Sequence, residues 1–192
     1  MKALVVFAHP NPKSFNKAIL DTVLAELQQK NIEVRVKDLY ASKFNPVLTG
    51  EDFEQFLAGK VPEDIAAEQA DVTWADTLIF IYPIWWVGQP AILKGWIDRV
   101  FSYGFAYQVT EEGPVGLLKG KLARVITTSG STAEVWSQIG VMEALNTVTI
   151  SGTFNFSGIT DVSHKNLYAV PNVTDADRKA MLVEVGQIIS SL

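Results

Sequence analysis

"TLIFIYPIWWVGQPAILKGWIDRVF", residues 77–101, contains a strand pattern, an aromatic turn and a helix pattern in succession. The apolar run 77–83 is typical of a strand buried on both faces. Pro90 suits the first turn of a helix, where its missing N–H is not needed, and the apolar residues of 91–101 recur at helical spacing. The stretch therefore predicts a strand followed by a helix, the repeating unit of α/β proteins.

The same alternation extends in both directions along the chain. Further strands are predicted at 3–8, 32–39, 122–130 and 159–170. The half-polar pattern of the second of these predicts a strand near a sheet edge. Short strands joined by long connections predict one parallel sheet covered by helices on both faces, and we expect the strand order 2-1-3-4-5.

Helical signals occupy the connections. Apolar residues at helical spacing follow the first strand, and Thr174 with Asp177 forms a capping box at the start of the last helix. Short helices are predicted on either side of Gly59 and Pro62. The residue propensities of 143–158 favour a strand, but the alternation of strands and helices along the chain predicts a helix here. We expect a helix that ends near Gly158.

Composition limits the class of protein. A length of 192 residues suits a single domain spanning 1–192. The net charge of −5 argues against nucleic-acid binding. The apolar stretches are too short to span a membrane, and the N-terminal apolar run is too short for a signal peptide, so no membrane insertion and a cytoplasmic location are expected.

The absence of cysteine excludes disulfides and thiolate chemistry. The only histidines are His9 and His164, and no carboxylates lie at ligand spacing, so no metal site is predicted. His164 has no evident partner and is expected to be a surface or strand histidine. Any redox chemistry must therefore come from a bound cofactor.

Three loops are expected to meet at the carboxyl ends of the strands, where ligands of open α/β sheets bind. The first, 8–16, carries Ser14 and Asn16 at a helix start, which suits a phosphate but also suits ordinary helix capping. The second, 82–90, contains two adjacent tryptophans that would stack on a flat ring or fill the core. The third, 127–134, is small and polar, as in a turn or along the edge of a heterocycle.

These loops belong to a longer series of motifs. The series comprises "AHPNPKSFN" at 8–16, "DLYASKFNP" at 38–46, "DIAAEQ" at 64–69, the segment 75–107, and "ITTSGS" at 126–131. In this order they resemble the flavodoxin-like, DT-diaphorase-like NAD(P)H:quinone oxidoreductase family. The match runs from the first strand to about residue 131 and is most specific over 75–107.

The resemblance implies a flavin in the three loops. It assigns the phosphate end of the flavin to His9, Ser14, Phe15 and Asn16. It assigns the flavin ring to Pro83, Ile84, Trp85, Trp86 and Val87, and the other edge of the flavin to Thr127, Thr128, Ser129 and Gly130. The doubled tryptophan is accordingly interpreted as a cofactor wall, and replacing Trp86 with alanine is expected to weaken flavin retention.

The resemblance also implies a homodimer whose substrate pocket is shared between two subunits. Tyr107 is expected to line this pocket, and Trp136 stands near the position of a family tyrosine, so both are candidate catalytic residues. The histidine that follows that tyrosine in the family is missing here, and Val109 replaces a family aromatic residue. An insertion that helps to hold an adenine in the longer family members is missing between about residues 58 and 62, so FAD and FMN are both left open, with FAD slightly ahead because the loop 9–16 matches the FAD-binding form.

The functional hypothesis is ping-pong hydride transfer from NAD(P)H through the flavin to a quinone or a similar acceptor. One alternative is a flavin-binding ancillary subunit of a potassium-efflux system, as some family relatives are. A second is an electron-carrier flavodoxin, but such proteins are usually far more acidic than this chain. The physiological acceptor and the choice between NADH and NADPH are left open by the sequence.

Overall fold

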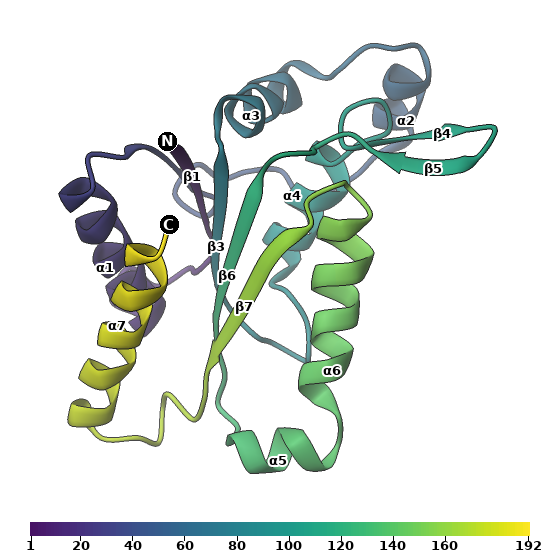
Figure 1. The fold of residues 1–192 in the computed structure, drawn as a ribbon. Coiled ribbons are helices and arrows are strands. Elements are labelled where there is room, and N and C mark those ends of the chain that lie inside the picture. Colours follow the sequence, from purple (N-terminus) through teal and green to yellow (C-terminus); the bar gives the residue numbers. More distant parts are fainter.

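Five segments form one parallel sheet in the computed structural model, which describes residues 1–192 (Figure 1). The strands are β1 (Lys2–Phe7), β2 (Glu33–Asp38), β3 (Thr77–Pro83), β6 (Leu122–Thr128) and β7 (Asp161–Leu167). Their order is β2-β1-β3-β6-β7, which confirms the expected order 2-1-3-4-5. β2 lies at an edge, as its half-polar sequence predicted.

Helices connect the strands. They are α1 (Phe15–Gln29), α2 (Gly50–Leu57), α3 (Glu63–Trp74), α4 (Ala91–Val100), α5 (Ala133–Gln138), α6 (Val141–Asn146), the π-helix η1 (Thr147–Asn155) and α7 (Asp175–Ser190). Thr174 and Asp177 form the predicted capping box of α7, and Thr49 with Asp52 forms another at α2. None of these helices has the length and apolarity needed to cross a membrane.

The sheet has an apolar core on each face. Alternate strand residues point to opposite faces, so Ile79 and Ile81 pack toward α1 and α7, whereas Leu78 and Phe80 pack on the other side. Figure 1 shows α1 and α7 together on one face, with α3, α4 and α6 on the other. This burial on both faces explains the continuous apolar run of β3.

The segment 143–158 is helical, as its place in the alternation predicted. The helix ends at Asn155, and Gly158 follows with a φ of +90°. A Cβ atom on the facing Gly116 would lie 2.2 Å from the backbone nitrogen of Gly158. Only glycines allow the two backbones to approach this closely.

A two-stranded hairpin follows α4 and was not predicted. β4 (Tyr107–Thr110) pairs with β5 (Gly113–Gly116) in antiparallel fashion. Its strands are short and mostly exposed, so they lack the burial pattern that marks β3. Because α4 runs back along the sheet, the hairpin lies near the amino ends of the sheet strands (Figure 1).

Candidate functional site

Loops from β1, β3, β6 and β7 meet at the carboxyl edge of the sheet and form a cleft of about 240 Å³. The residues that line this cleft are His9, Ser14, Phe15, Asn16, Pro83, Ile84, Trp85, Thr128, Ser129, Gly130, Val170 and Pro171. Ten of them were named from the sequence. The three predicted loops therefore do converge on one place.

The first loop presents the start of α1 to the cleft. Ser14 caps the helix, and its Oγ accepts a hydrogen bond from the backbone N–H of Lys17 at 3.2 Å. The next two backbone N–H groups, those of Phe15 and Asn16, have no acceptor within the helix. Free N–H groups and the positive end of the helix dipole favour an anion at this point.

Asn16 connects the first loop to the third. Its Nδ2 donates to Thr128 Oγ1 at 2.9 Å, and the side chain is 3% exposed. The Oδ1 atom of Asn16 is buried and has no hydrogen-bond partner. A buried acceptor without a donor is costly, so a hydroxyl or N–H of a ligand in the cleft would satisfy it.

The aromatic turn has a strained backbone. Trp85 and Gly88 exchange two backbone hydrogen bonds of 3.0 Å, and the two residues between them have φ values of 52° and 53°. Such values are typical of a type I′ turn but unfavourable for tryptophan and especially for the β-branched Val87. The backbone N–H groups of Trp86 and Val87 make no hydrogen bond within the chain. Strain of this kind accumulates at functional sites, and here it leaves two donors free.

The two tryptophans have different positions. Trp85 lines the cleft, with its ring centroid 6.0 Å from that of His9. Trp86 is fully exposed at 101%, so its ring fills no core of this chain, and Val87 borders a separate pocket beside α6. His9 accepts a hydrogen bond from the N–H of Asn11 through Nδ1, and burial lowers the pKa of His9. His9 is therefore neutral at pH 7.

Trp85→Ala is expected to weaken flavin binding about tenfold, because the stacking surface of the cleft would be lost. Trp86→Ala, which is expected from the sequence to weaken flavin retention, should have a smaller effect than Trp85→Ala because the Trp86 side chain is fully exposed. Fluorescence titration of the two apoproteins with FMN and FAD measures both effects. A larger loss for Trp86→Ala would mean that the exposed indole folds over the bound flavin.

The first residue of the third loop, Thr127, does not line the cleft but is buried beside it. Thr127 is completely buried, and its Oγ1 lies 2.9 Å from His164 Nε2 on β7. His164 Nδ1 lies 2.8 Å from Asn146 Oδ1, so this histidine has two partners that the sequence did not reveal. His164 lies in a strand, as expected. Burial lowers the pKa of His164 to about 4.

This pKa makes stability depend on pH. Between pH 6.5 and 4 the unfolded chain binds a proton at His164 that the folded chain does not, so stability falls as the pH falls through this window. The expected loss between pH 7 and pH 5 is about 2 kcal/mol. Urea unfolding at both pH values measures it, and His164→Gln should abolish most of the difference. An unchanged difference in that variant would assign the proton uptake to other groups.

A fourth loop, which sequence reasoning did not include, completes the cleft. Val170 and Pro171 follow β7 and also line the cleft. The N–H of Val170 donates to Ser129 O at 3.0 Å, and the N–H of Ala169 donates to Ser131 O at 2.9 Å. The topology could have revealed this loop, because it also follows the carboxyl end of a sheet strand.

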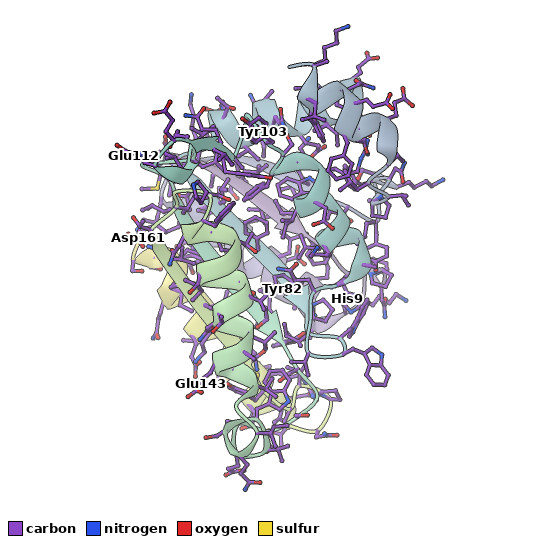
Figure 2. The ribbon with its side chains drawn as sticks, turned by 90° about the vertical axis from the view of Figure 1, so that its right-hand side faces the viewer. His9, Tyr82, Tyr103, Glu112, Glu143 and Asp161 are labelled. Carbon is purple, nitrogen blue, oxygen red and sulfur yellow. The ribbon has the colours of Figure 1, made fainter.

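The two candidate catalytic residues lie outside the cleft of their own chain. Trp136, on α5, is 7% exposed and packs edge-on against Tyr168 with ring centroids 5.8 Å apart. Tyr107 begins the hairpin and stacks near Tyr103 and Phe156. Figure 2 shows Tyr103 at the end of the molecule away from His9. Tyr107 and the cleft therefore do not meet within one chain.

A larger groove of about 410 Å³ surrounds Tyr107. It is lined by apolar and aromatic side chains from α2, α4, η1 and the hairpin region, among them Phe53, Phe101, Tyr103, Tyr107 and Phe156. Its size alone does not make it the active-site candidate. The smaller cleft lies at the carboxyl edge of the sheet and holds an unpaired buried acceptor and free N–H groups, which are the features of a ligand site.

The donor set of the cleft fits a flavin. The start of α1, the polar residues 128–130 and Trp85 of the aromatic turn line one cleft, and the free N–H groups of Trp86 and Val87 follow Trp85 in that turn. A flavin has a phosphate, a polar ring edge and a flat conjugated ring, which are complementary to these features. The structure brings together no group of three or more metal-ligating side chains.

Comparison with known proteins gives a consistent result. Residues 1–189 match the model of a family described as having a flavodoxin-like fold. An NAD(P)H oxidoreductase of Haemophilus influenzae, itself described as uncharacterized, is 40% identical over 183 residues, which cover 95% of this chain and 91% of that protein. Human ribosyldihydronicotinamide dehydrogenase [quinone] is 33% identical over an alignment that covers 100% of this chain and 91% of that protein.

A solved structure agrees with these matches. The NAD(P)H:quinone oxidoreductase from Methanothermobacter marburgensis superposes with a TM-score of 0.90 at 31% identity, covering 99% of this chain and 98% of that one. The superposition covers 99% of this chain and therefore extends beyond residue 131, where the sequence motifs end. The resemblance inferred from the motifs is thereby confirmed, and the chain belongs to the flavodoxin-like family that includes these quinone reductases.

Proposed function

We propose that this protein is an NAD(P)H:quinone-type oxidoreductase that works through a flavin held in the cleft. The observation that carries the proposal is the cleft itself, which is lined by the start of α1, by Trp85 of the aromatic turn and by the polar residues 128–130. The names of the relatives support the same reaction class. A bound flavin would supply the chemistry for ping-pong hydride transfer between NAD(P)H and a quinone.

The protein contributes position and polarity. The start of α1 would hold the flavin phosphate, and Asn16 Oδ1 would accept a hydrogen bond from a ligand hydroxyl or N–H. The N–H groups of Trp86 and Val87, held in place by the strained turn, would serve as donors to the ring. Trp85 would close one side of the cleft and exclude water. No side chain need act as a nucleophile.

One experiment tests both the identity of the flavin and the reaction. We expect FAD to bind more tightly than FMN, because the loop 9–16 has the FAD-binding form. Titration of the apoprotein with each flavin, followed by turnover with NADH or NADPH and a soluble quinone, tests both points. Saturable flavin binding with quinone-dependent nucleotide oxidation is the expected result, and apoprotein that binds neither flavin would contradict the proposal.

The proposal includes a homodimer. Tyr107 packs against Tyr103, which lies away from His9 in Figure 2, and it lines a different groove from the cleft. A shared pocket therefore requires Tyr107 to come from a second copy. Mixing an inactive Asn16→Asp chain with an inactive Tyr107→Ala chain should then restore activity, since one of the two sites in each mixed dimer is intact. The unmixed variants, each refolded alone, are the controls. Absence of recovery in verified mixed dimers would show that each chain builds its site alone.

The ancillary-subunit alternative predicts different behaviour. Such a protein would bind flavin in the same cleft but would act mainly by contacting a transporter. A flavin-loaded protein that oxidises neither NADH nor NADPH, yet copurifies with a potassium-efflux system, would favour it.

A further inference from the structure

A chain of polar side chains is buried beneath the cleft between β6 and β7. It runs from His164 through Thr127 and Asn166 to Ser129, and we call it the β6–β7 network. The bonds are His164 Nε2 to Thr127 Oγ1 at 2.9 Å, Thr127 Oγ1 to Asn166 Oδ1 at 2.9 Å, and Asn166 Nδ2 to Ser129 Oγ at 3.0 Å. Only its last member, Ser129, lines the cleft.

The parallel pairing of the strands explains why these side chains meet. Thr127 lies opposite Asn166, and Val125 lies opposite His164, in the register of β6 and β7. Residues two apart along a strand share a face, so Thr127, Asn166 and His164 all point to the side covered by α6. Thr127 is 0% and Asn166 is 4% exposed, so the network is shielded from competing water.

Burial and hydrogen-bond valence couple the members of the network. With its pKa lowered to about 4, His164 is a neutral imidazole with one N–H. If that hydrogen is on Nε2, Thr127 Oγ1 accepts from His164 and donates to Asn166 Oδ1. If it is on Nδ1, it is donated to Asn146 Oδ1 at 2.8 Å, and Thr127 Oγ1 donates to His164 Nε2 instead.

The position of the His164 hydrogen is relayed to the cleft through Asn166. With the hydrogen on Nε2, the amide nitrogen of Asn166 donates to Ser129 Oγ at 3.0 Å, and the hydrogen of Ser129 is left with Ser131 O at a long 3.3 Å. That oxygen already accepts from the N–H of Ala169 at 2.9 Å, so the hydrogen of Ser129 is available to a better acceptor. With the hydrogen on Nδ1, the Asn166 amide is turned over, its oxygen accepts from Ser129, and Ser129 can only accept from a ligand.

We infer that the β6–β7 network sets the direction in which Ser129 hydrogen-bonds to a flavin in the cleft, with His164 as the positioning residue whose ring hydrogen determines that direction. This inference rests on the proposed function. The network positions and does not transfer protons, because proton transfer through the Asn166 amide would need an unfavourable imidic acid form. His164 therefore affects binding without touching the ligand.

Thr127→Val tests the inference, because it keeps the β-branched shape and removes the hydroxyl that links His164 to Asn166. The apoprotein should bind flavin about fivefold more weakly, as expected for one misdirected hydrogen bond. Thr77→Val is the matched control, since Thr77 is a buried strand threonine whose hydroxyl has no partner and which lies at the other end of β3. Its flavin affinity should equal that of the wild type.

A double-mutant cycle separates positioning from general destabilisation. If the network acts through Ser129, then Thr127→Val should have little further effect on flavin affinity in a Ser129→Ala background. His164→Leu should behave like Thr127→Val, while His164→Gln should restore most of the affinity because its amide can donate to Thr127. Thermal unfolding of each apoprotein reports folding independently of flavin.

The outcomes distinguish this inference from the proposed function. Wild-type apoprotein that binds neither FMN nor FAD would overturn the proposed function and this inference with it. Wild-type binding with unchanged affinity in folded Thr127→Val, or with fully additive effects of Thr127→Val and Ser129→Ala, would overturn the inference alone. If Thr127→Val does not fold, the His164→Leu and His164→Gln pair decides by the same criterion.

Discussion

Asn16→Asp is expected to weaken flavin binding about 100-fold, a loss of roughly 3 kcal/mol. The substitution keeps the size of a 3% exposed side chain but places a negative charge beside the proposed phosphate position at the start of α1. It also removes the donor to Thr128 Oγ1. Like charges in a shielded site repel strongly because little water screens them. Flavin titration of the variant apoprotein measures the effect.

Asn11→Asp is the matched control for this prediction. Asn11 lies in the same loop but is exposed, and its Oδ1 already accepts from the backbone N–H of Lys13 at 2.8 Å, a bond that a carboxylate preserves. The same charge change should then alter flavin affinity only slightly and more at low salt than at high salt. Equal losses in the two variants would show that the general charge of the loop, rather than the position of Asn16, controls binding.

Arg99→Met is expected to destabilise the folded chain by about 3–5 kcal/mol. Arg99, on α4, is 4% exposed and forms a bidentate pair with Asp52 on α2 through two contacts of 3.0 Å. It also contacts Asp64 on α3 at 2.6 Å. These bonds hold the pKa of Asp52 below its usual value. Removing the guanidinium would leave the carboxylate of Asp52 buried without its partner.

Urea unfolding of the apoprotein measures this loss. Arg124→Met is the matched control, because Arg124 pairs with Asp161 at 2.8 Å, but that carboxylate is exposed and loses little when unpaired. The expected loss for the control is below about 1 kcal/mol. Arg99 thus connects α4 to α2 through Asp52 and to α3 through Asp64. Similar losses in both variants would show that these buried contacts contribute no more to stability than the exposed pair does.

The sheet could be predicted because its strands carry strong local signals. β3 is buried on both faces and reads as a continuous apolar run, and the alternation of strands and helices determines the rest of the topology. The hairpin of β4 and β5 gave no such signal, because short exposed strands bury little. In 143–158 the β-branched residues favoured a strand, and the helix forms because its apolar side, including Phe154, packs on the sheet.

The three loops that form the cleft were predicted, but the buried hydrogen bonds beneath it were not. The partners of His164 lie 18 and 37 residues away in the sequence, and only the register of β6 against β7 and the packing of α6 reveal them. Loop conformation was also inaccessible: the positive φ values at Trp86 and Val87 turn one indole into solvent and leave Trp85 in the cleft. Residue type alone does not determine such strained turns.

The central claim is that the cleft holds a flavin that NAD(P)H reduces. The most direct measurement is the visible absorbance of flavin-loaded protein without oxygen, before and after addition of NADH or NADPH and then of a quinone. The account predicts that the flavin band is lost with one or both nucleotides and returns with the quinone. A bound flavin that neither nucleotide reduces, or a protein that takes up no flavin, would contradict it.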